Sequence, residues 1–204
     1  MALDRLLDMH ARGRLRGIPA DKFAENRDWI RRDIEDWAWN PDLECCTQTP
    51  GGDTLGAAVL PMAFCGFAEA SSRRMRQTYC KLQERLGAGP GLIHRYEQSF
   101  EGGEGAFAMC CFWLAEFLAR GGGILDDAHH TFSQTLAHAS DLGFFAEEID
   151  PRTGDALGNF PQAFTHVGLI NAALTLAERE ENEPQSHRGH RDQNTEKGKT
   201  HKAF

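Results

Sequence analysis

The chain has 204 residues, of which 41% are hydrophobic and 25% charged, a composition typical of one globular domain with a substantial core. Its net charge of −8 argues against a nucleic-acid partner, which would require a basic stripe to neutralise phosphates. No apolar run is long enough to span a bilayer, and the opening stretch MALDRLLDMHARGRLRG lacks the apolar core of a signal peptide, so we expect a cytoplasmic protein with no membrane partner.

Apolar residues recur at helical spacing along most of the chain, and this spacing predicts an all-α fold without convincing alternating strands. The stretch 55–67 is apolar throughout and predicts a buried helix. The other helical stripes are Leu3, Leu6, Leu7 and Leu15; Phe23, Ile30, Ile34 and Trp37; Met75, Tyr79, Leu82 and Leu86; Phe107, Cys111, Leu114 and Leu118; Phe132, Leu136 and Leu142; and Phe164, Val167, Asn171 and Leu174.

Two long loops, residues 40–52 and 87–105, separate some of these helices, and long ordered loops in a compact domain usually carry function. Residues 179–204 contain almost no large apolar side chains and predict a disordered polar tail, which leaves residues 1–178 as the folded part. The chain starts inside an amphipathic pattern without an N-cap residue, so we expect it to be the C-terminal piece of a longer protein.

Six cysteines stand at positions 45, 46, 65, 80, 110 and 111. Two adjacent pairs suit neither a disulfide framework nor metal-binding CxxC spacing. We therefore expect buried free thiols in a reducing compartment. His129 and His130 are also adjacent, and neighbouring residues on a helix point in different directions, so we expect no metal site there.

Residues 141–166, DLGFFAEEIDPRTGDALGNFPQAFTH, contain the strongest chemical signal. An apolar run ends in two adjacent carboxylates, Glu147 and Glu148, and a turn-rich loop follows before the next helix. Such a loop, carried by a rigid helical scaffold, is well placed to present a side chain to a ligand.

The chain resembles bacterial glycoside hydrolases of family 15, the glucoamylase-like and trehalase-like enzymes, in several motifs that fall in the family order. Together they cover roughly residues 1–178, and the pairing of EEIDPRTG with LGNFPQAF is the most specific. The motifs are DTLGAAVLPMAFCGF, GLIHRYEQS, GGEGAFAMCCFWLAEFLARGG and FFAEEIDPRTGDALGNFPQAFTHVGLINAAL.

This resemblance implies the C-terminal portion of an (α/α)6 toroid, in which inner and outer helices surround a pocket. It also implies hydrolysis of α-glucosides with inversion, which needs two carboxylates and no cofactor. The general base of the family maps to Glu147. The general acid lies upstream of the helix with which this chain begins, so we expect the toroid to be incomplete.

Taken alone, Glu147 and Glu148 suggest a solvated acidic pair at a helix end, and only the surrounding motif favours Glu147 as the base. Glu148 is less favoured, although it could position the loop. Arg95 and Tyr96 match a sugar-contacting segment of the family, because an arginine fork suits paired hydroxyls and an aromatic face can stack on a pyranose. A structural Arg–carboxylate pair with a half-buried tyrosine is the alternative.

Glu104 lies between glycines and could bind sugar hydroxyls, but capping of the helix that follows is the stronger alternative. Trp113 lies within an apolar stretch, so we expect core packing rather than sugar stacking, and we expect the same of Trp29, Trp37 and Trp39. For His166, we favour packing of the last helix with the ring hydrogen-bonded to a backbone carbonyl.

Three functions follow. The first is a piece of an inverting α-glucoside hydrolase that carries the base without the acid and acts on maltooligosaccharides, isomalto-type sugars or trehalose. The second is a non-catalytic half that binds sugar or a partner and associates through exposed helix faces. The third, a lyase or epimerase on the same toroid, is disfavoured by the paired motifs.

Overall fold

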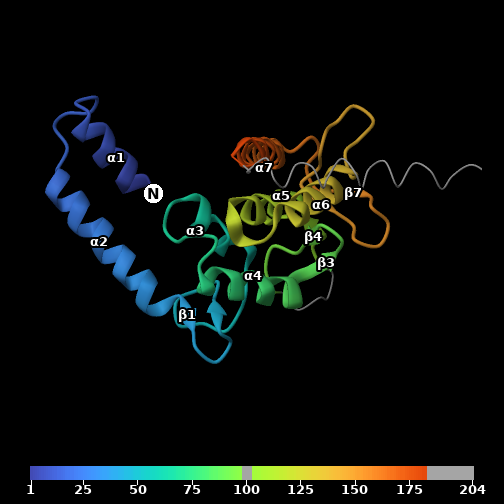
Figure 1. The fold of residues 1–204 in the computed structure, drawn as a ribbon, viewed down its shortest axis with the longest axis horizontal. Coiled ribbons are helices and arrows are strands. Elements are labelled where there is room, and N and C mark those ends of the chain that lie inside the picture. The colour runs from blue at the N-terminus through green and yellow to red at the C-terminus, as the bar shows by residue number, and fades with distance from the viewer. Residues whose placement is uncertain (98–102, 183–204) are drawn as a thin grey trace, which may run out of the picture.

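The computed structural model describes residues 1–97 and 103–182 and is mostly helical, as predicted (Figure 1). The predicted polar tail lies outside the described residues from residue 183 onward. Its first residues belong instead to the last helix, which continues to Glu181. The helices, in chain order, are α1 Ala2–Ala11, α2 Ala20–Trp37, α3 Pro61–Phe64, α4 Arg73–Leu86, α5 Ala108–Phe117, α6 Leu125–Leu136 and α7 Ala163–Glu181.

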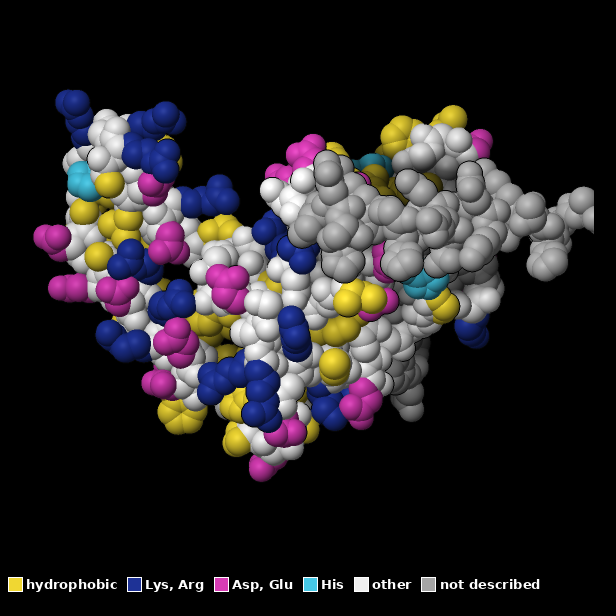
Figure 2. Space-filling view, viewed as in Figure 1, with side chains coloured by type: hydrophobic (Ala, Val, Ile, Leu, Met, Phe, Trp, Pro, Cys, Tyr) yellow, Lys and Arg dark blue, Asp and Glu magenta, His cyan; other side chains and the backbone are white. Residues whose placement is uncertain are grey.

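Helices α1 and α2 form an arm that stands away from the rest of the molecule (Figure 1). Neither helix buries a residue, and apolar side chains are visible along the arm in Figure 2. The expected core packing of Trp29 and Trp37 is therefore wrong, because each side chain is about three-fifths exposed at 60% and 59%. The first helical stripe is also too long, since α1 ends before Leu15 in a turn at Gly13 with φ +69°.

Helix α4 confirms the stripe that begins at Met75. Ser72 caps its N-terminus by accepting a hydrogen bond from the Met75 amide at 3.3 Å, and the helix buries Met75, Leu82 and Leu86. The Thr78 hydroxyl accepts a hydrogen bond from the Cys46 amide at 2.9 Å, which joins α4 to the small hairpin in the loop before it.

The predicted buried helix over residues 55–67 is wrong. The structure has a single 3-10 turn, η1 Ala57–Val59, followed by the four-residue helix α3. The backbone of this segment forms hydrogen bonds to another part of the chain instead. The Glu97 amide donates to the Leu55 carbonyl at 3.0 Å, and the Ala57 amide donates to the Arg95 carbonyl at 2.8 Å. These bonds hold the start of the segment extended, so a continuous helix cannot form.

Helix α5 is the centre of the fold. It is apolar on nearly all sides and packs against α6 and α7, and a π-helical turn, η2 Leu118–Gly122, extends it. Phe112 meets Phe132 of α6 with ring centroids 5.7 Å apart and Phe145 with centroids 5.2 Å apart. Trp113 and Trp39 pack against the main core cluster, as predicted.

Helix α7 faces the core with a different side from the one predicted. Phe164, Val167 and Leu174 of the predicted stripe are each more than half exposed. Apart from Leu176, the buried residues of this helix are small, and a Cβ added at Gly168 would lie 3.4 Å from atoms of Met109 and Phe112 of α5. The two helices approach each other so closely that only small residues fit at their contact. The spacing of large apolar residues does not reveal such a contact.

The loops contain short strands that a period-two pattern could not indicate, since each described strand has only two or three residues. They form two hairpins and one antiparallel sheet of three strands in the order β5-β6-β7. The strands are β1 Trp39–Asn40, β2 Cys45–Cys46, β3 Gly87–Gly89, β4 Leu92–Ile93, β5 Ala106–Phe107, β6 Glu148–Ile149 and β7 Ala156–Leu157. Phe107 therefore belongs to a strand, and α5 begins only at the next residue.

All six cysteines are free. The two adjacent pairs are buried as predicted, and burial raises the pKa of Cys111 to about 12, so this thiol stays protonated at neutral pH. Cys65 and Cys80 are exposed, which corrects the expectation for those two residues.

Two leucines of the predicted helical stripes differ in burial, since Leu82 lies in the core and Leu142 lies at the surface. We expect Leu82→Ala to lower the free energy of unfolding by about 2–5 kcal/mol, because it removes a fully buried side chain and leaves a cavity. The matched control is Leu142→Ala, which truncates a side chain that is 75% exposed and lies beyond the end of α6. Urea denaturation of both variants measures the difference, and equal losses of stability would contradict this core.

Candidate active site

The sheet β5-β6-β7 brings together two loops that are distant in sequence. Phe107 of β5 pairs with Glu148 of β6, and Glu148 also pairs with Leu157 of β7. The Ala108 amide, at the start of α5, donates to the Glu147 carbonyl at 3.0 Å. The two adjacent carboxylates are thereby fixed beside the N-terminus of the central helix.

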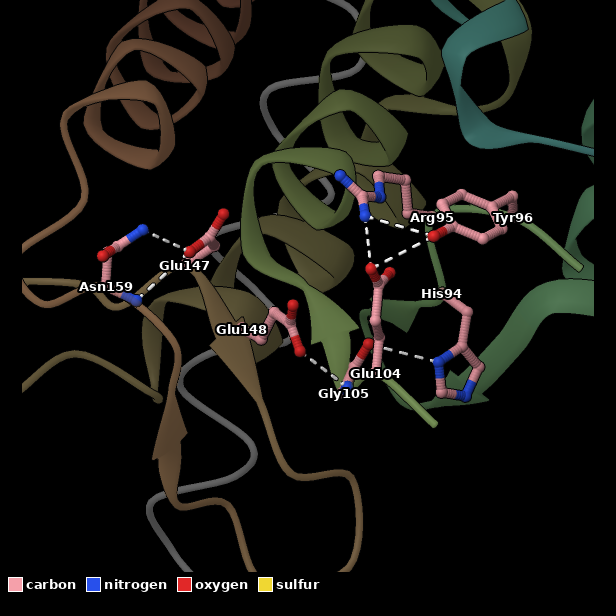
Figure 3. A network of polar contacts seen from close by, with 8 residues as sticks. All are labelled: His94, Arg95, Tyr96, Glu104, Gly105, Glu147, Glu148 and Asn159. Atoms are coloured by element: carbon pink, nitrogen blue, oxygen red, sulfur yellow. Dashed lines mark hydrogen bonds and ion pairs between the residues drawn. The ribbon is translucent and has the colours of Figure 1, made fainter. Parts of the chain in front are cut away.

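Glu147 is half-buried and held by Asn159 (Figure 3). Its Oε2 accepts one hydrogen bond from the Asn159 side-chain Nδ2 at 2.7 Å and another from the Asn159 amide at 3.2 Å. Its own amide donates to the Asn159 carbonyl at 2.9 Å. No described residue donates a hydrogen bond to the other carboxylate oxygen, Oε1, so that oxygen is open to a water or a ligand.

Gly158 makes this arrangement possible. Its φ of +73° favours glycine, and an added Cβ would lie only 3.0 Å from both the Cβ and the Oε2 of Glu147. The turn can therefore approach the carboxylate closely enough for Asn159 to reach it.

Arg95, Tyr96 and Glu104 form one cluster (Figure 3). Glu104 Oε1 accepts from the Arg95 guanidinium and from the Tyr96 hydroxyl, the latter at 3.2 Å, and Arg95 Nη2 lies 3.3 Å from the same hydroxyl. The guanidinium carbon lies 4.9 Å from the centre of the Tyr96 ring and 4.7 Å from that of Phe107. Burial opposes the charge of Arg95, but the hydrogen bonds to Glu104 and Tyr96 outweigh it and raise the pKa of Arg95.

An open hollow of about 650 Å³ lies beside Glu104. Its wall contains charged side chains from both loops, including Glu104, Asp150 and Arg152. A hydrogen bond from the Arg152 amide is the main reason why the pKa of Asp150 lies below its usual value, so Asp150 is ionised at neutral pH. Glu147 does not line this hollow, because its side chain faces Asn159.

The structure thus brings together three of the predicted site residues and leaves the fourth apart. Arg95, Tyr96 and Glu104 contact one another, whereas no hydrogen bond between described residues links them directly to Glu147. The alternative of a structural Arg–carboxylate pair describes the observed contact. The capping role for Glu104 is wrong, because it pairs with Arg95 and the N-terminus of α5 has no side-chain cap.

His166 has the structural role that we expected. Its Nδ1 lies 2.7 Å from the Gln162 carbonyl, and its Nε2 accepts a 3.4 Å hydrogen bond from the Phe145 amide. The ring therefore ties α7 to the strand-like segment that leads to Glu147.

Sequence reasoning missed Asn159, Gly158 and Gly105 as parts of the site. The motif LGNFPQAF contains Asn159 and Gly158. Its position shortly after the acidic pair was the sequence feature that could have indicated their role in the site. Their roles depend on the turn that folds residues 158 and 159 back over Glu147, and this turn is a tertiary feature.

Among the described residues, no group of three histidine, cysteine, aspartate or glutamate side chains could hold a metal ion. The described helices likewise include none that is both long and apolar enough to cross a membrane.

The fold and the paired motifs define a protein of the glycosidase class. The profile of the glycosyl hydrolases of family 15 matches residues 1–174, and the chain belongs to this family.

The relatives that the chain matches in sequence are trehalases by name. The chain is 41% identical over 140 residues to a trehalase of Mycolicibacterium smegmatis, a match that covers 66% of this chain and 21% of the relative. It is 32% identical over 165 residues to a trehalase of Thermoplasma volcanium, covering 78% of this chain and 26% of the relative. The chain thus spans between about a fifth and a quarter of the length of these relatives.

Solved structures of glycosidases share the fold. A wild-type glycosidase superposes with a TM-score of 0.68 at 15% identity, covering 80% of this chain and 47% of that one. A glycosidase variant in complex with glucose gives the same TM-score at 16% identity, with 81% and 47% covered. The chain therefore forms part of an α/α toroid and corresponds to about half of these structures.

The Arg95–Glu104 contact should contribute to stability. We expect Glu104→Ala to lower the free energy of unfolding by about 1 kcal/mol, because it leaves a half-buried guanidinium without its carboxylate. Glu84→Ala is the control, since Glu84 forms an exposed ion pair with Lys81 and its loss should have no measurable effect. Chemical denaturation compares the two variants, and a Glu104→Ala protein as stable as Glu84→Ala would contradict a cohesive cluster.

Proposed function

We propose that this chain supplies the general-base side of an inverting α-glucoside hydrolase site, with Glu147 as the base. Inverting glycosidases activate a water with one carboxylate while a second group protonates the leaving oxygen from the opposite side. Trehalose is the first candidate substrate because the matched relatives are named trehalases, and maltooligosaccharides or isomalto-type sugars are the other candidates.

The hydrogen bonding of the Glu147 carboxylate is the observation that supports this proposal most directly. Asn159 anchors one oxygen through two hydrogen bonds and leaves Oε1 without a donor among the described residues. A base needs this combination, because the anchored oxygen fixes the geometry while the open oxygen accepts a proton from water. Glu147 is also the residue to which the family resemblance assigns the base.

The neighbouring carboxyl groups do not suit the role of the acid. Glu104 is ion-paired with Arg95, and Glu148 accepts a hydrogen bond from the Gly105 amide. Asp150 is kept ionised by its hydrogen bonds, chiefly from the Arg152 amide. We infer that the general acid comes from the part of the toroid that the resemblance places upstream, and that the isolated chain is inactive or nearly so.

The cluster of Arg95, Tyr96 and Glu104 is proposed to contact the sugar. Arg95 presents a guanidinium whose charge is retained at any working pH, and such a fork suits two adjacent hydroxyls. Its pairing with Glu104 does not prevent this role, since a positioned ion pair offers both donors and acceptors. The open hollow beside Glu104 leaves room for a ligand at this end of the cluster.

A chimera tests the base directly. The matched part of the Mycolicibacterium smegmatis trehalase is replaced by this chain, and glucose release from trehalose is measured. We expect activity that Glu147→Gln lowers by about 10²–10⁴-fold, because the amide cannot accept the proton of the water. Asp141→Asn makes the same change at an exposed carboxylate and should leave the rate unchanged. If the Glu147→Gln chimera releases glucose at a rate within about threefold of that of its parent, the base must be another residue.

The isolated chain is assayed in parallel with trehalose and maltose, and we expect no glucose above background. Robust release that Glu147→Gln abolishes would show that this chain holds its own acid.

A non-catalytic binding role is the second candidate, and it depends on the surface of α7. Phe164, Val167, Ile170 and Leu174 are each more than half exposed on this one helix. A contiguous apolar face of this kind is typical of a contact surface rather than of free solvent exposure. A half that associates through this face would bind a partner without hydrolysing sugar.

Light scattering coupled to size-exclusion chromatography tests this association. We expect the molar mass of the isolated chain to exceed that of a monomer as concentration rises, because association buries the apolar face of α7. The double variant Ile170→Asp and Leu174→Asp should return it to a monomer. Leu136→Asp is the control, since Leu136 is an exposed leucine on a different helix, α6. A wild-type monomer at every concentration would contradict the association.

A further inference from the structure

The geometry points to Glu148 as a positioning residue that holds the Glu104 loop at a fixed distance from Glu147. This inference rests on the proposed roles of Glu147 and of the Arg95–Tyr96–Glu104 cluster. It separates the functions of two adjacent glutamates that the sequence does not distinguish by residue type.

The contact itself joins two parts of the chain that are 43 residues apart. The Gly105 amide donates a hydrogen bond to Glu148 Oε2 at 2.8 Å (Figure 3). Hydrogen bonds to an ionised carboxylate are roughly twice as strong as neutral ones. Glu148 therefore binds the backbone of the β5 loop through its side chain, in addition to the strand pairing between Phe107 and Glu148.

Gly105 is held on its other sides as well. Its carbonyl lies 3.2 Å from His94 Nδ1, and a Cβ added to it would lie 2.6 Å from the Ile149 carbonyl oxygen and 3.1 Å from Leu157 Cδ1. Only glycine allows the loop to pack this closely onto β6 and β7. The position of this backbone is thus defined by Glu148, His94 and direct contact with the sheet.

Glu104 is the residue that immediately precedes this fixed point. A displacement of Gly105 would move the backbone from which the Glu104 side chain reaches Arg95 and Tyr96. Glu147 immediately precedes β6 and Glu148 begins it, and successive residues of an extended chain point to opposite sides, so the two side chains face different groups. One glutamate is aimed at Asn159 and the other at the Gly105 loop (Figure 3). Glu148 thereby sets the separation between the proposed base and the proposed sugar contacts.

The mode of contact also decides against Glu148 as the base. Its carboxylate accepts a hydrogen bond from the Gly105 amide, which has no other described acceptor. Displacing Glu148 would leave that donor, on a buried residue, unsatisfied. A side chain bound in this way can influence a ligand only by positioning the loop. Glu147, in contrast, has one carboxylate oxygen without a described donor.

Nuclear magnetic resonance of the full 204-residue chain tests the position of the loop. The Gly105 amide signal reports the contact with Glu148, and the signal of the Arg95 Nη2 protons reports the pair with Glu104. We expect Glu148→Ala to shift or broaden both signals. Glu148→Gln should largely preserve them, because its side-chain carbonyl still accepts the hydrogen bond. Glu147→Gln is the matched control and should leave both signals in place.

Glu148→Asp keeps the charge but shortens the reach, so it should resemble Glu148→Ala, and it serves as the second variant if the alanine protein is poorly folded. Unchanged Gly105 and Arg95 signals in both of these variants would overturn the inference. So would a Glu148→Gln protein as perturbed as Glu148→Ala, since charge rather than a hydrogen-bond acceptor would then be required.

Calorimetric titration with trehalose and with glucose gives the functional readout. We expect Glu148→Ala to weaken sugar binding about tenfold, and Glu148→Gln to stay within about threefold of the wild type. Equal affinity of Glu148→Ala and the wild type would reject a positioning role in binding. If the wild-type chain binds neither sugar, the proposed sugar contacts fail in the isolated chain, and the resonance data alone decide whether Glu148 positions the loop.

Discussion

The antiparallel pairing of β5 with β6 is the contact on which the candidate site depends. It joins the loop before α5 to the acidic segment before α7, and the Ala108 amide adds a bond to the Glu147 carbonyl at the start of the buried central helix. Because α5 is the most buried helix in the fold, this pairing anchors the site residues to the rigid part of the molecule. The strands have only two residues each, so the surrounding helices stabilise them.

The distribution of apolar surface relates the fold to the family. Helices α5, α6 and α7 pack together, whereas α1 and α2 bury no residue and α7 keeps an apolar face exposed. The glycosidases with the same fold are about twice the length of the aligned part. In a toroid every helix has neighbours on both sides, so exposed apolar faces on the first and last helices are expected where only part of the ring is present.

The site combines two kinds of polar contact that a list of charged residues does not separate. Glu147 has an anchored oxygen and an open one, which suits chemistry on a bound water. Glu104 and Glu148 are engaged by Arg95 and by a backbone amide, which suits the fixing of a loop. Under the proposed function, this division would let a short acidic motif hold both the proposed base, Glu147, and the residue that supports the neighbouring loop, Glu148.

The sequence alone determined the helical class, the family and the acidic pair, because these depend on local periodicity and on motifs in a fixed order. It also placed α4 and the buried cysteine pairs correctly. It failed over residues 55–67, where hydrogen bonds to Glu97 and Arg95 replace helical ones, and on α7, where Gly168 rather than the apolar stripe faces α5.

The contact of Asn159 with Glu147 and that of Gly105 with Glu148 were decided only by the tertiary structure. Each requires a loop to approach the acidic segment closely at a glycine, across 12 residues of chain for Asn159 and 43 for Gly105, and helical periodicity carries no information about such an approach.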